Sequence, residues 1–490
     1  MGTLKNLIMR EKTFLGHPVG LFVLFFTEMG ERFSFYGMKA ILFLYLIKGV
    51  EDGALGLPED LAGAIFGLYA AAVYILTLPG GWIADNLIGQ KKAIWWGGII
   101  IMIGHILLAI PGSNAYFFAG LVSVAFGTGL LKANISSIVG DLYPEGGAKR
   151  DSAFSIFYMG INSGSLLGMI IVGYLGEKIG WHYGFGAAAF AMFIGLIVFR
   201  SFRGPLKHVG NEPEVKGSPN FLYALAAILL IIFLILYFEV ISLVEFTNYM
   251  QYVVPLLTVL YFAYIGFFDS SLTVAEKKRV AVLFIFFVGA AVFWSGFEQS
   301  STTLTIFAER YTDRHIFDWE MPASWLQSAN SFFILIFSAV FAALWIFLAK
   351  KKMNPSTPLK FGLGLFNLAL AFFVLFTASK LVLDGTKANV GWLLLTYLLF
   401  TLGELCVSPV GLSTYTKLAP RKYYSQMMGL WFVAASLGNL IAGLFAGNFT
   451  VDAVNDIPGL FLQVCLISLG IGLILAVFSG PIKRWMGGIE

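Results

Sequence analysis

Long apolar segments separated by short polar loops run through the whole chain of 490 residues. A helix needs roughly 20 predominantly apolar residues to cross a bilayer. The pattern predicts fourteen such helices, at 18–48, 58–84, 91–111, 115–140, 150–176, 181–200, 220–238, 250–268, 280–302, 323–349, 360–379, 388–416, 424–448 and 457–482. Because this number is even, we expect both ends of the chain on one side of the membrane.

Composition supports the same interpretation. Apolar residues make up 58% of the chain and charged residues 12%, and the mean hydropathy is +0.82. These values lie far outside the range of soluble domains, so the sequence predicts an all-α polytopic membrane protein. With the N-terminus inside, 23 of the 32 lysines and arginines fall on the cytoplasmic side, six on the other side and three within spans. The positive-inside rule therefore places both termini in the cytoplasm.

Several function classes are excluded or unsupported. The net charge of +4 follows from the asymmetry of the loops, so no nucleic-acid partner is expected. Cys406 and Cys465 lie in apolar spans, and the five histidines lack the spacing of metal ligands. The chain has no GxxxxGK[ST] sequence for binding ATP. We therefore expect no metal, no cofactor and no catalytic residue, and an ion gradient as the energy source.

Polar segments divide the chain into three parts. A polar linker at 208–220 follows the sixth predicted span, and a charged segment at 276–279 precedes the ninth. We therefore predict a six-helix bundle at 1–207, a linker with an inserted helical hairpin at 208–278, and a second six-helix bundle at 279–490. Two six-helix halves are the plan of the major facilitator superfamily. The loop GGWIADNLIGQKKAI, between spans two and three, resembles the cytoplasmic signature of that superfamily.

Ionisable residues within the spans are the first candidates for chemistry, because burying charge in lipid is costly. They are Glu28, Glu31, Arg32, Lys39, Lys132, Glu298 and Glu404. At 100° per residue, the four in the first span share one helix face. A cluster that only joins helices is the alternative, but seven groups on four helices favour a functional site. Four acids against three bases leave one negative charge unmatched, and desolvation would favour a proton on one carboxylate.

Neutral polar residues at helical spacing extend these faces. They are Tyr158, Asn162 and Ser165 in span five, Trp294 beside Glu298, and Ser408 one turn after Glu404. Tyr74 and Asn330 are further candidates for the same cavity, although each alone is more often a packing residue.

Five segments resemble one known family. EMGERFSFYG at 28–37 and FYMGINSGSL at 157–166 are similar to two signatures of the proton-dependent oligopeptide transporter family. GTGLLKANISSIVGDLY, FWSGFEQS and TLGELCVSPVGLS, around Lys132, Glu298 and Glu404, resemble further family segments. The resemblance extends over the two six-helix halves and the inserted hairpin. It departs at two positions, where Phe35 replaces a signature tyrosine and Lys39 replaces the usual arginine.

The resemblance implies a role for each candidate. Arg32 and Lys132 would hold the carboxylate of a peptide, and Glu404 its amino terminus. The cavity for the side chains would be lined by Tyr36, Tyr74, Tyr158, Asn162, Trp294, Asn330, Ser408 and Trp431. Glu28 and Glu31, with Arg32 and Lys132, would respond to protons, and Glu298 would pair with Lys39 as a gate.

The predicted function is a proton-coupled symporter that imports di- and tripeptides by alternating access. The same fold carrying another small substrate, such as nitrate or an amino-acid conjugate, is the first alternative. A membrane enzyme or channel is the second, but the sequence contains no nucleophile with a base and no repeated pore ring. We expect a monomer in the inner membrane of a bacterium.

Overall fold

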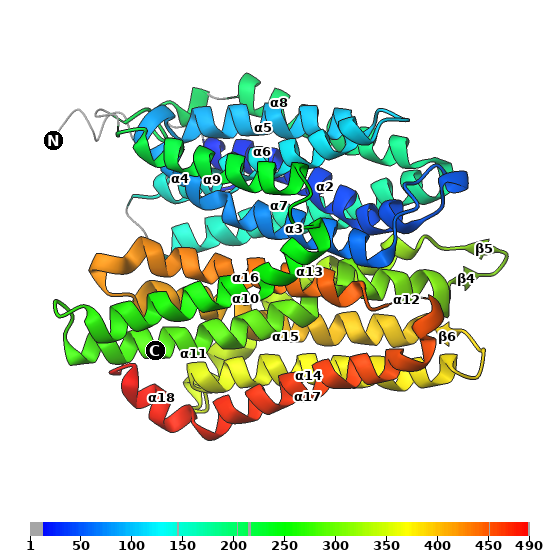
Figure 1. Ribbon diagram of the computed structural model, residues 1–490. Helices are drawn as coiled ribbons and strands as arrows, with labels where there is room; N and C mark the ends of the chain where they lie inside the picture. The colour runs from blue at the N-terminus through cyan, green and yellow to red at the C-terminus, as the bar shows by residue number, and fades with distance from the viewer. Residues whose placement is uncertain (1–12, 145–146, 203, 214–216, 450, 489–490) are drawn as a thin grey trace. The chain divides into compact units, whose positions relative to one another are not determined.

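The computed structural model describes residues 13–144, 147–202, 204–213, 217–449 and 451–488 (Figure 1). The α-helices are α2 (Val19–Ile47), α3 (Glu59–Ile75), α4 (Thr77–Ile83), α5 (Gln90–Leu108), α6 (Asn114–Asp141), α7 (Gly147–Tyr174), α8 (Trp181–Ser201), α9 (Asn220–Tyr237), α10 (Leu243–Ala263), α11 (Val274–Phe297), α12 (Thr303–Tyr311), α13 (Ser328–Lys350), α14 (Thr357–Val382), α15 (Val390–Leu418), α16 (Tyr424–Ala446), α17 (Ile457–Val477) and α18 (Ser479–Trp485).

Short elements extend or connect these helices. Three π-helical turns, Ala84–Ile88, Leu175–Ile179 and Tyr264–Phe268, continue α4, α7 and α10. The 3-10 helices are Val50–Asp52, Gly204–Leu206, Glu298–Ser301, Ala323–Gln327, Arg421–Tyr423 and Val451–Asp456. Strands β1 (Thr13–Phe14) and β2 (His17–Pro18) pair antiparallel, as do β4 (His315–Ile316) and β5 (Trp319–Glu320), and β3 (Thr312–Asp313) pairs parallel with β6 (Ala388–Asn389).

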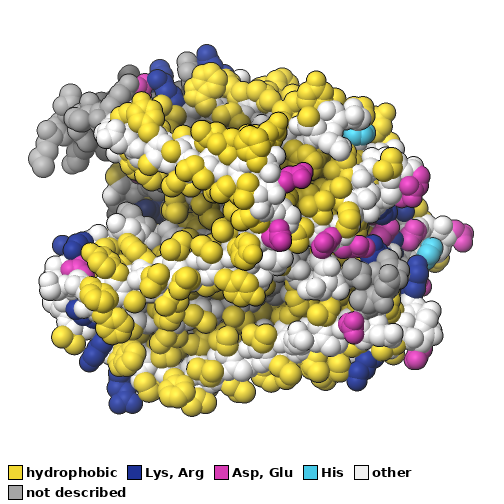
Figure 2. Space-filling model, viewed as in Figure 1, with side chains coloured by type: hydrophobic (Ala, Val, Ile, Leu, Met, Phe, Trp, Pro, Cys, Tyr) yellow, Lys and Arg dark blue, Asp and Glu magenta, His cyan; other side chains and the backbone are white. Residues whose placement is uncertain are grey.

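Among the described residues, thirteen helices are long and apolar enough to cross a membrane. The 29-residue α2 is outside that count, because Glu28, Glu31, Arg32 and Lys39 interrupt its apolar sequence. The all-α, multi-span prediction is confirmed, and the number fourteen stays a prediction. Hydrophobic side chains cover most of the face shown in Figure 2.

Two helices begin six or seven residues earlier than the apolar pattern predicts. The predicted spans at 250–268 and 280–302 correspond to helices that begin at Leu243 and Val274. In each case a capping box starts the helix, with Ser242 paired to Glu245 and Thr273 paired to Glu276. The capping side chains satisfy amide groups that the first helical turn leaves without partners. The predicted starts are wrong because the search followed apolar residues and not caps.

The described chain forms two compact units. The first contains the described residues up to Ile41 together with Ala72–Phe238, and the second contains Leu42–Ala71 and the described residues from Glu239. The boundary therefore passes through α2 and α3. The predicted three-part division at residues 207 and 278 stays a prediction.

In the first unit, glycines bring α2 and α7 into direct backbone contact. A Cβ atom at Gly164 would overlap the carbonyl oxygen of Met29, and one at Gly168 would overlap that of Phe33. Small residues permit this close helix approach in membranes. On another side, Leu21 and Leu24 of α2 join a buried apolar cluster with residues of α5 to α8. The remaining face of α2 carries the charges.

The second unit packs α14 against α15 and α17, and α11 against α16. The first part of α3 joins this unit at Gly63, where a Cβ atom would overlap the backbone of Gly443 in α16. Buried phenylalanines, including Phe286 and Phe361 with stacked rings 4.6 Å apart, fill the space between helices. This packing holds α13 and α15, which carry Asn330 and Glu404.

The segment predicted as an inserted hairpin contains α9 and α10, and the pairing of these two helices stays a prediction. None of the residues of α9 is buried, although its sequence is almost entirely apolar. An almost entirely apolar helix without a buried residue is suited to lipid contact.

Candidate functional site

A compact ion cluster on α2 forms the first half of the site. Glu28, Glu31 and Arg32 are at most 2% exposed. Arg32 Nε lies 2.8 Å from Glu28 Oε1 and 2.5 Å from Glu31 Oε2. These close contacts are ion pairs without hydrogen-bond alignment, and no described residue donates a hydrogen bond to Glu28 Oε2 or Glu31 Oε1. One guanidinium therefore contacts both buried carboxylates, so the three groups share one side of α2 as predicted.

Aromatic rings surround the cations of the first unit. Arg32 Cζ lies 5.7 Å from the ring centre of Phe35 and 5.9 Å from that of Tyr36. Lys132 Nζ, from α6, lies 4.0 Å from the ring centre of Tyr74. Cation–π contacts stabilise a desolvated cation by up to about 2 kcal/mol. Phe35 keeps its ring beside Arg32, so replacing the signature tyrosine removes a hydroxyl but not this contact.

Helix α7 adds polar groups to the first unit. The Asn162 side-chain amide donates a hydrogen bond of 3.0 Å to the backbone oxygen of Tyr158. The Tyr158 side chain is 39% exposed, whereas Ser165 is buried. Asn162 thus uses one donor within its own helix, as a packing residue does, and its predicted contact with substrate stays a prediction.

The second unit presents a single carboxylate bound by an amide. Asn330 Nδ2 donates to Glu404 Oε2 and to Thr401 Oγ1, at 3.1 Å each. Thr401 Oγ1 donates to the backbone oxygen of Tyr397 at 2.8 Å. The structure thus brings Asn330 and Glu404 together. Our search of the sequence missed Thr401, although its place three residues before Glu404 puts it on the same helix face.

The other candidates of the second unit lie on α11, α15 and α16. Glu298 is 4% exposed, at the point where α11 gives way to a 3-10 turn. Trp294 Nε1 and Ser408 Oγ are buried without a hydrogen bond to any described residue. Trp431 packs its ring 5.3 Å from that of Tyr415. That environment is typical of a packing residue, and the predicted lining role of Trp431 stays a prediction.

Lys39 is buried on α2. It belongs to the first unit and Glu298 to the second. Their predicted pairing therefore stays a prediction. The predicted roles of the other site residues also stay predictions.

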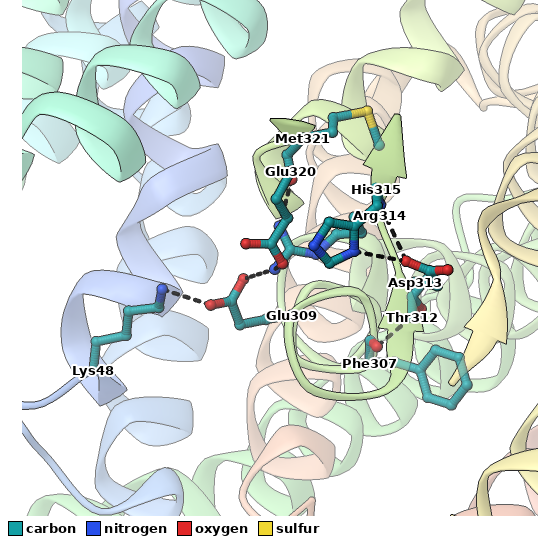
Figure 3. A network of polar contacts seen from close by, with 9 residues as sticks. All are labelled: Lys48, Phe307, Glu309, Thr312, Asp313, Arg314, His315, Glu320 and Met321. Atoms are coloured by element: carbon teal, nitrogen blue, oxygen red, sulfur yellow. Dashed lines mark hydrogen bonds and ion pairs between the residues drawn. The ribbon is translucent and has the colours of Figure 1, made fainter. Parts of the chain in front are cut away.

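A set of ion pairs in the second unit was missed by the sequence analysis. Lys48, just after α2, lies 2.6 Å from Glu309 of α12, and Arg314 lies 2.7 Å from the other oxygen of Glu309 (Figure 3). Arg314 also contacts Glu320 at 2.9 Å and donates to the backbone oxygen of Met321. The set thus joins the end of α2 to α12 and to the β4–β5 hairpin.

Two further pairs lie near this set. Arg310 Nη2 contacts Glu59 Oε1, at the start of α3, at 2.7 Å. Asp313 lies 2.9 Å from His315 Nδ1 (Figure 3). Hydrogen bonds from the side chain and backbone of His315 lower the pKa of Asp313. Lys48 and Glu309, like Glu59 and Arg310, are distant in sequence, so helical spacing gives no signal for these two pairs.

Residues 91–474 match the POT family. The chain belongs to that family. It is 42% identical to the "Peptide transporter YePEPT" of Yersinia enterocolitica, over 98% of this chain and 97% of the relative. It is 38% identical to the "Di-/tripeptide transporter" of Lactococcus lactis subsp. cremoris, over 99% of this chain and all of the relative.

Solved structures extend the same result to the fold. The crystal structure of a peptide transporter POT in complex with sulfate has a TM-score of 0.90 and 39% identity, covering 97% of both chains. A POT family transporter in complex with 5-aminolevulinic acid has a TM-score of 0.88 and 33% identity, covering 96% of this chain and 98% of the other. This POT family member is therefore a multi-pass membrane transporter and not an enzyme.

Proposed function

We propose that this POT family member is a proton-coupled symporter that imports di- and tripeptides by alternating access. The main observation is that oppositely charged groups lie in different units. The first unit carries buried Arg32 and half-buried Lys132, and the second carries Glu404, which accepts a hydrogen bond from the neutral amide of Asn330. A peptide is a zwitterion, with one carboxylate and one ammonium group. The names of the Yersinia and Lactococcus relatives support peptides as the substrate class.

The α2 cluster supports coupling to protons. Glu28 and Glu31 share Arg32, and a substrate carboxylate would add a third negative group to the competition for it. A proton on one glutamate removes a competing charge, so proton binding and carboxylate binding favour each other. Because such coupling is reciprocal, a bound peptide would also favour protonation. Inward proton flow would then supply the free energy.

The ion pairs of Lys48 and Glu59 support a gating step. They join the ends of α2 and α3 to α12. Alternating access requires that each side of a transporter open and close in turn. Opening at these helix ends would break the pairs, so they would form and break once in each transport cycle. We propose that the protein is a monomer in the inner membrane of a bacterium. Both of its termini would lie in the cytoplasm.

One observation favours a second candidate substrate. The relative with 33% identity binds 5-aminolevulinic acid, which carries a carboxylate and an ammonium group but no peptide bond. A small amino-acid-like zwitterion therefore fits the same charged groups. Nitrate fits less well, because Glu404 would repel an anion.

Uptake of labelled dialanine into proteoliposomes tests the proposal. We expect accumulation above equilibrium only with an inward proton gradient. Glu298→Gln should abolish this accumulation while leaving peptide exchange. Equal flux with and without the gradient would indicate a channel, and uptake of 5-aminolevulinic acid without dialanine uptake would favour the second candidate.

A further inference from the structure

A basic cavity lies in the first unit, where α5 begins and α8 ends. Its volume is ≈ 470 Å³, and its lining includes Lys91, Lys92, Trp95, Trp96, Arg200 and Lys207. None of these residues belongs to the candidate transport site. Its polar and aromatic groups come from two helix ends and from the linker that follows α8.

Lys91 fixes the linker against α5. The backbone N–H of Lys91 donates to Gly210 O at 3.0 Å. Its ammonium group donates to Leu206 O at 3.0 Å and to Asn211 Oδ1 at 2.7 Å. The charge of Lys91 is thus used to hold the linker in place. This anchoring positions Lys207 at the cavity, so the site does not depend on a freely moving loop.

The cavity has more positive charge than its acidic neighbour can balance. Lys92 is paired with Glu212 at 2.5 Å. Arg200 and Lys207 are exposed, and in the described part of the chain neither has an acidic partner. Cations gathered in a hollow attract an anion more strongly than isolated surface cations do.

The other lining groups favour an amphiphilic anion. Trp95 is half-buried, Trp96 is 53% exposed, and tryptophan is enriched where a membrane meets water. Exposed Phe190, Ile194 and Ile197 form a stripe along α8 that leads to Arg200. A free phosphate would use the cations, but only a lipid would also use the tryptophans and the apolar stripe.

We propose that this cavity binds the phosphate headgroup of an anionic phospholipid, with an acyl chain along α8. Basic pockets between membrane helices are suited to such headgroups, and each nearby cation strengthens attraction by about fivefold. Trp95 and Trp96 would lie at the level of the glycerol backbone. The site is independent of the proposed transport function.

Native mass spectrometry of the full chain with phosphatidylglycerol tests the site. The double variant Arg200→Gln/Lys207→Gln should bind this lipid roughly 25-fold more weakly, from two factors of about five. The matched control, Lys350→Gln/Lys352→Gln, removes two exposed cations at the end of α13 and should leave binding unchanged. Equal lipid affinity in the first variant and the wild type would overturn the proposal.

A second measurement follows tryptophan fluorescence in place of lipid mass. Phosphatidylglycerol with brominated chains should quench part of the tryptophan fluorescence, and Trp95→Phe/Trp96→Phe should remove that part. Phosphatidylcholine should not compete, and millimolar glycerol phosphate should leave the quenching intact. Displacement by glycerol phosphate would assign the cavity to a soluble phosphate instead, and no quenching would rule out the lipid.

Discussion

The two units hold the carboxylates of the candidate site in different ways. In the first, Glu28 and Glu31 compete for one guanidinium within a single turn of α2. In the second, Glu404 accepts a hydrogen bond from Asn330, a neutral amide. An ion pair changes when a proton or a competing anion arrives, whereas a carboxylate with a neutral partner has no bound cation that a substrate ammonium group would have to displace. The first arrangement suits coupling, and the second suits recognition of an ammonium group.

Removing the charge of Glu404 should have the largest effect. We expect Glu404→Gln to lower kcat/KM for dialanine by on the order of 100-fold, because breaking a buried charge pair costs about 2–5 kcal/mol. Proteoliposome uptake measures this. The matched control is Thr401→Val, which removes a neutral acceptor of Asn330 and should cost less than about tenfold. Equal kcat/KM in wild type and Glu404→Gln would contradict the assigned role.

Neutralising one acid of the α2 cluster should separate coupling from binding. Glu31→Gln should abolish accumulation, which for one proton per peptide reaches about tenfold at a gradient of one pH unit. Counterflow exchange, which needs no gradient, should persist. Ser34→Ala, which removes a hydrogen bond to Glu31 O within the helix, is the control and should accumulate peptide normally. Gradient-driven accumulation by Glu31→Gln would remove that residue from coupling.

The ion pair between Glu59 and Arg310 should have a smaller effect, because both side chains are partly exposed. Partly exposed pairs contribute about 0.2–1 kcal/mol, so Glu59→Gln should change uptake by at most about fivefold. The charge swap Glu59→Arg/Arg310→Glu should restore wild-type uptake. Asp313→Asn, at a more exposed pair, is the control. If the charge swap reduced uptake as much as Glu59→Arg and Arg310→Glu do together, the ion pair would not contribute to transport.

Asp269 gives a third kind of carboxylate, with several donors. It accepts hydrogen bonds from Lys422 at 2.7 Å, Tyr423 at 2.6 Å and Ser271. These hydrogen bonds lower the pKa of Asp269, and the bond from Lys422 has the largest effect. A carboxylate whose pKa is lowered by folding stabilises the fold at pH values above its pKa in the unfolded chain, about 3.9. This stabilisation is lost as the pH falls below that value.

Thermal unfolding checks this smallest effect. The Tm of Asp269→Asn should lie a few degrees below that of the wild type at pH 7. The difference should narrow below about pH 4. Lys417→Gln, which changes a different basic residue near the end of α15, provides the comparison. If the difference in Tm between Asp269→Asn and the wild type became larger at acidic pH, the predicted pH dependence would be wrong.

Local patterns in the sequence predicted much of the fold and part of the site. Apolar length located the helices, and helical spacing placed Glu28, Glu31 and Arg32 on one face. The pairing of Lys48 with Glu309 could not be read in this way, because it depends on how distant helices pack. Two helix starts were missed although their capping boxes are visible in the sequence. Residue type suggested that Trp431 lines the cavity, but it did not reveal that this side chain is buried against Tyr415.

The direct contact between α2 and α7 has a consequence for measuring transport. Sliding or rotating one helix on the other would drive Gly164 or Gly168 into a carbonyl group of α2. A pair of spectroscopic probes, one on each helix within the first unit, should therefore report the same separation in every transport state. Such a pair supplies an internal ruler against which distances that do change during the cycle can be calibrated.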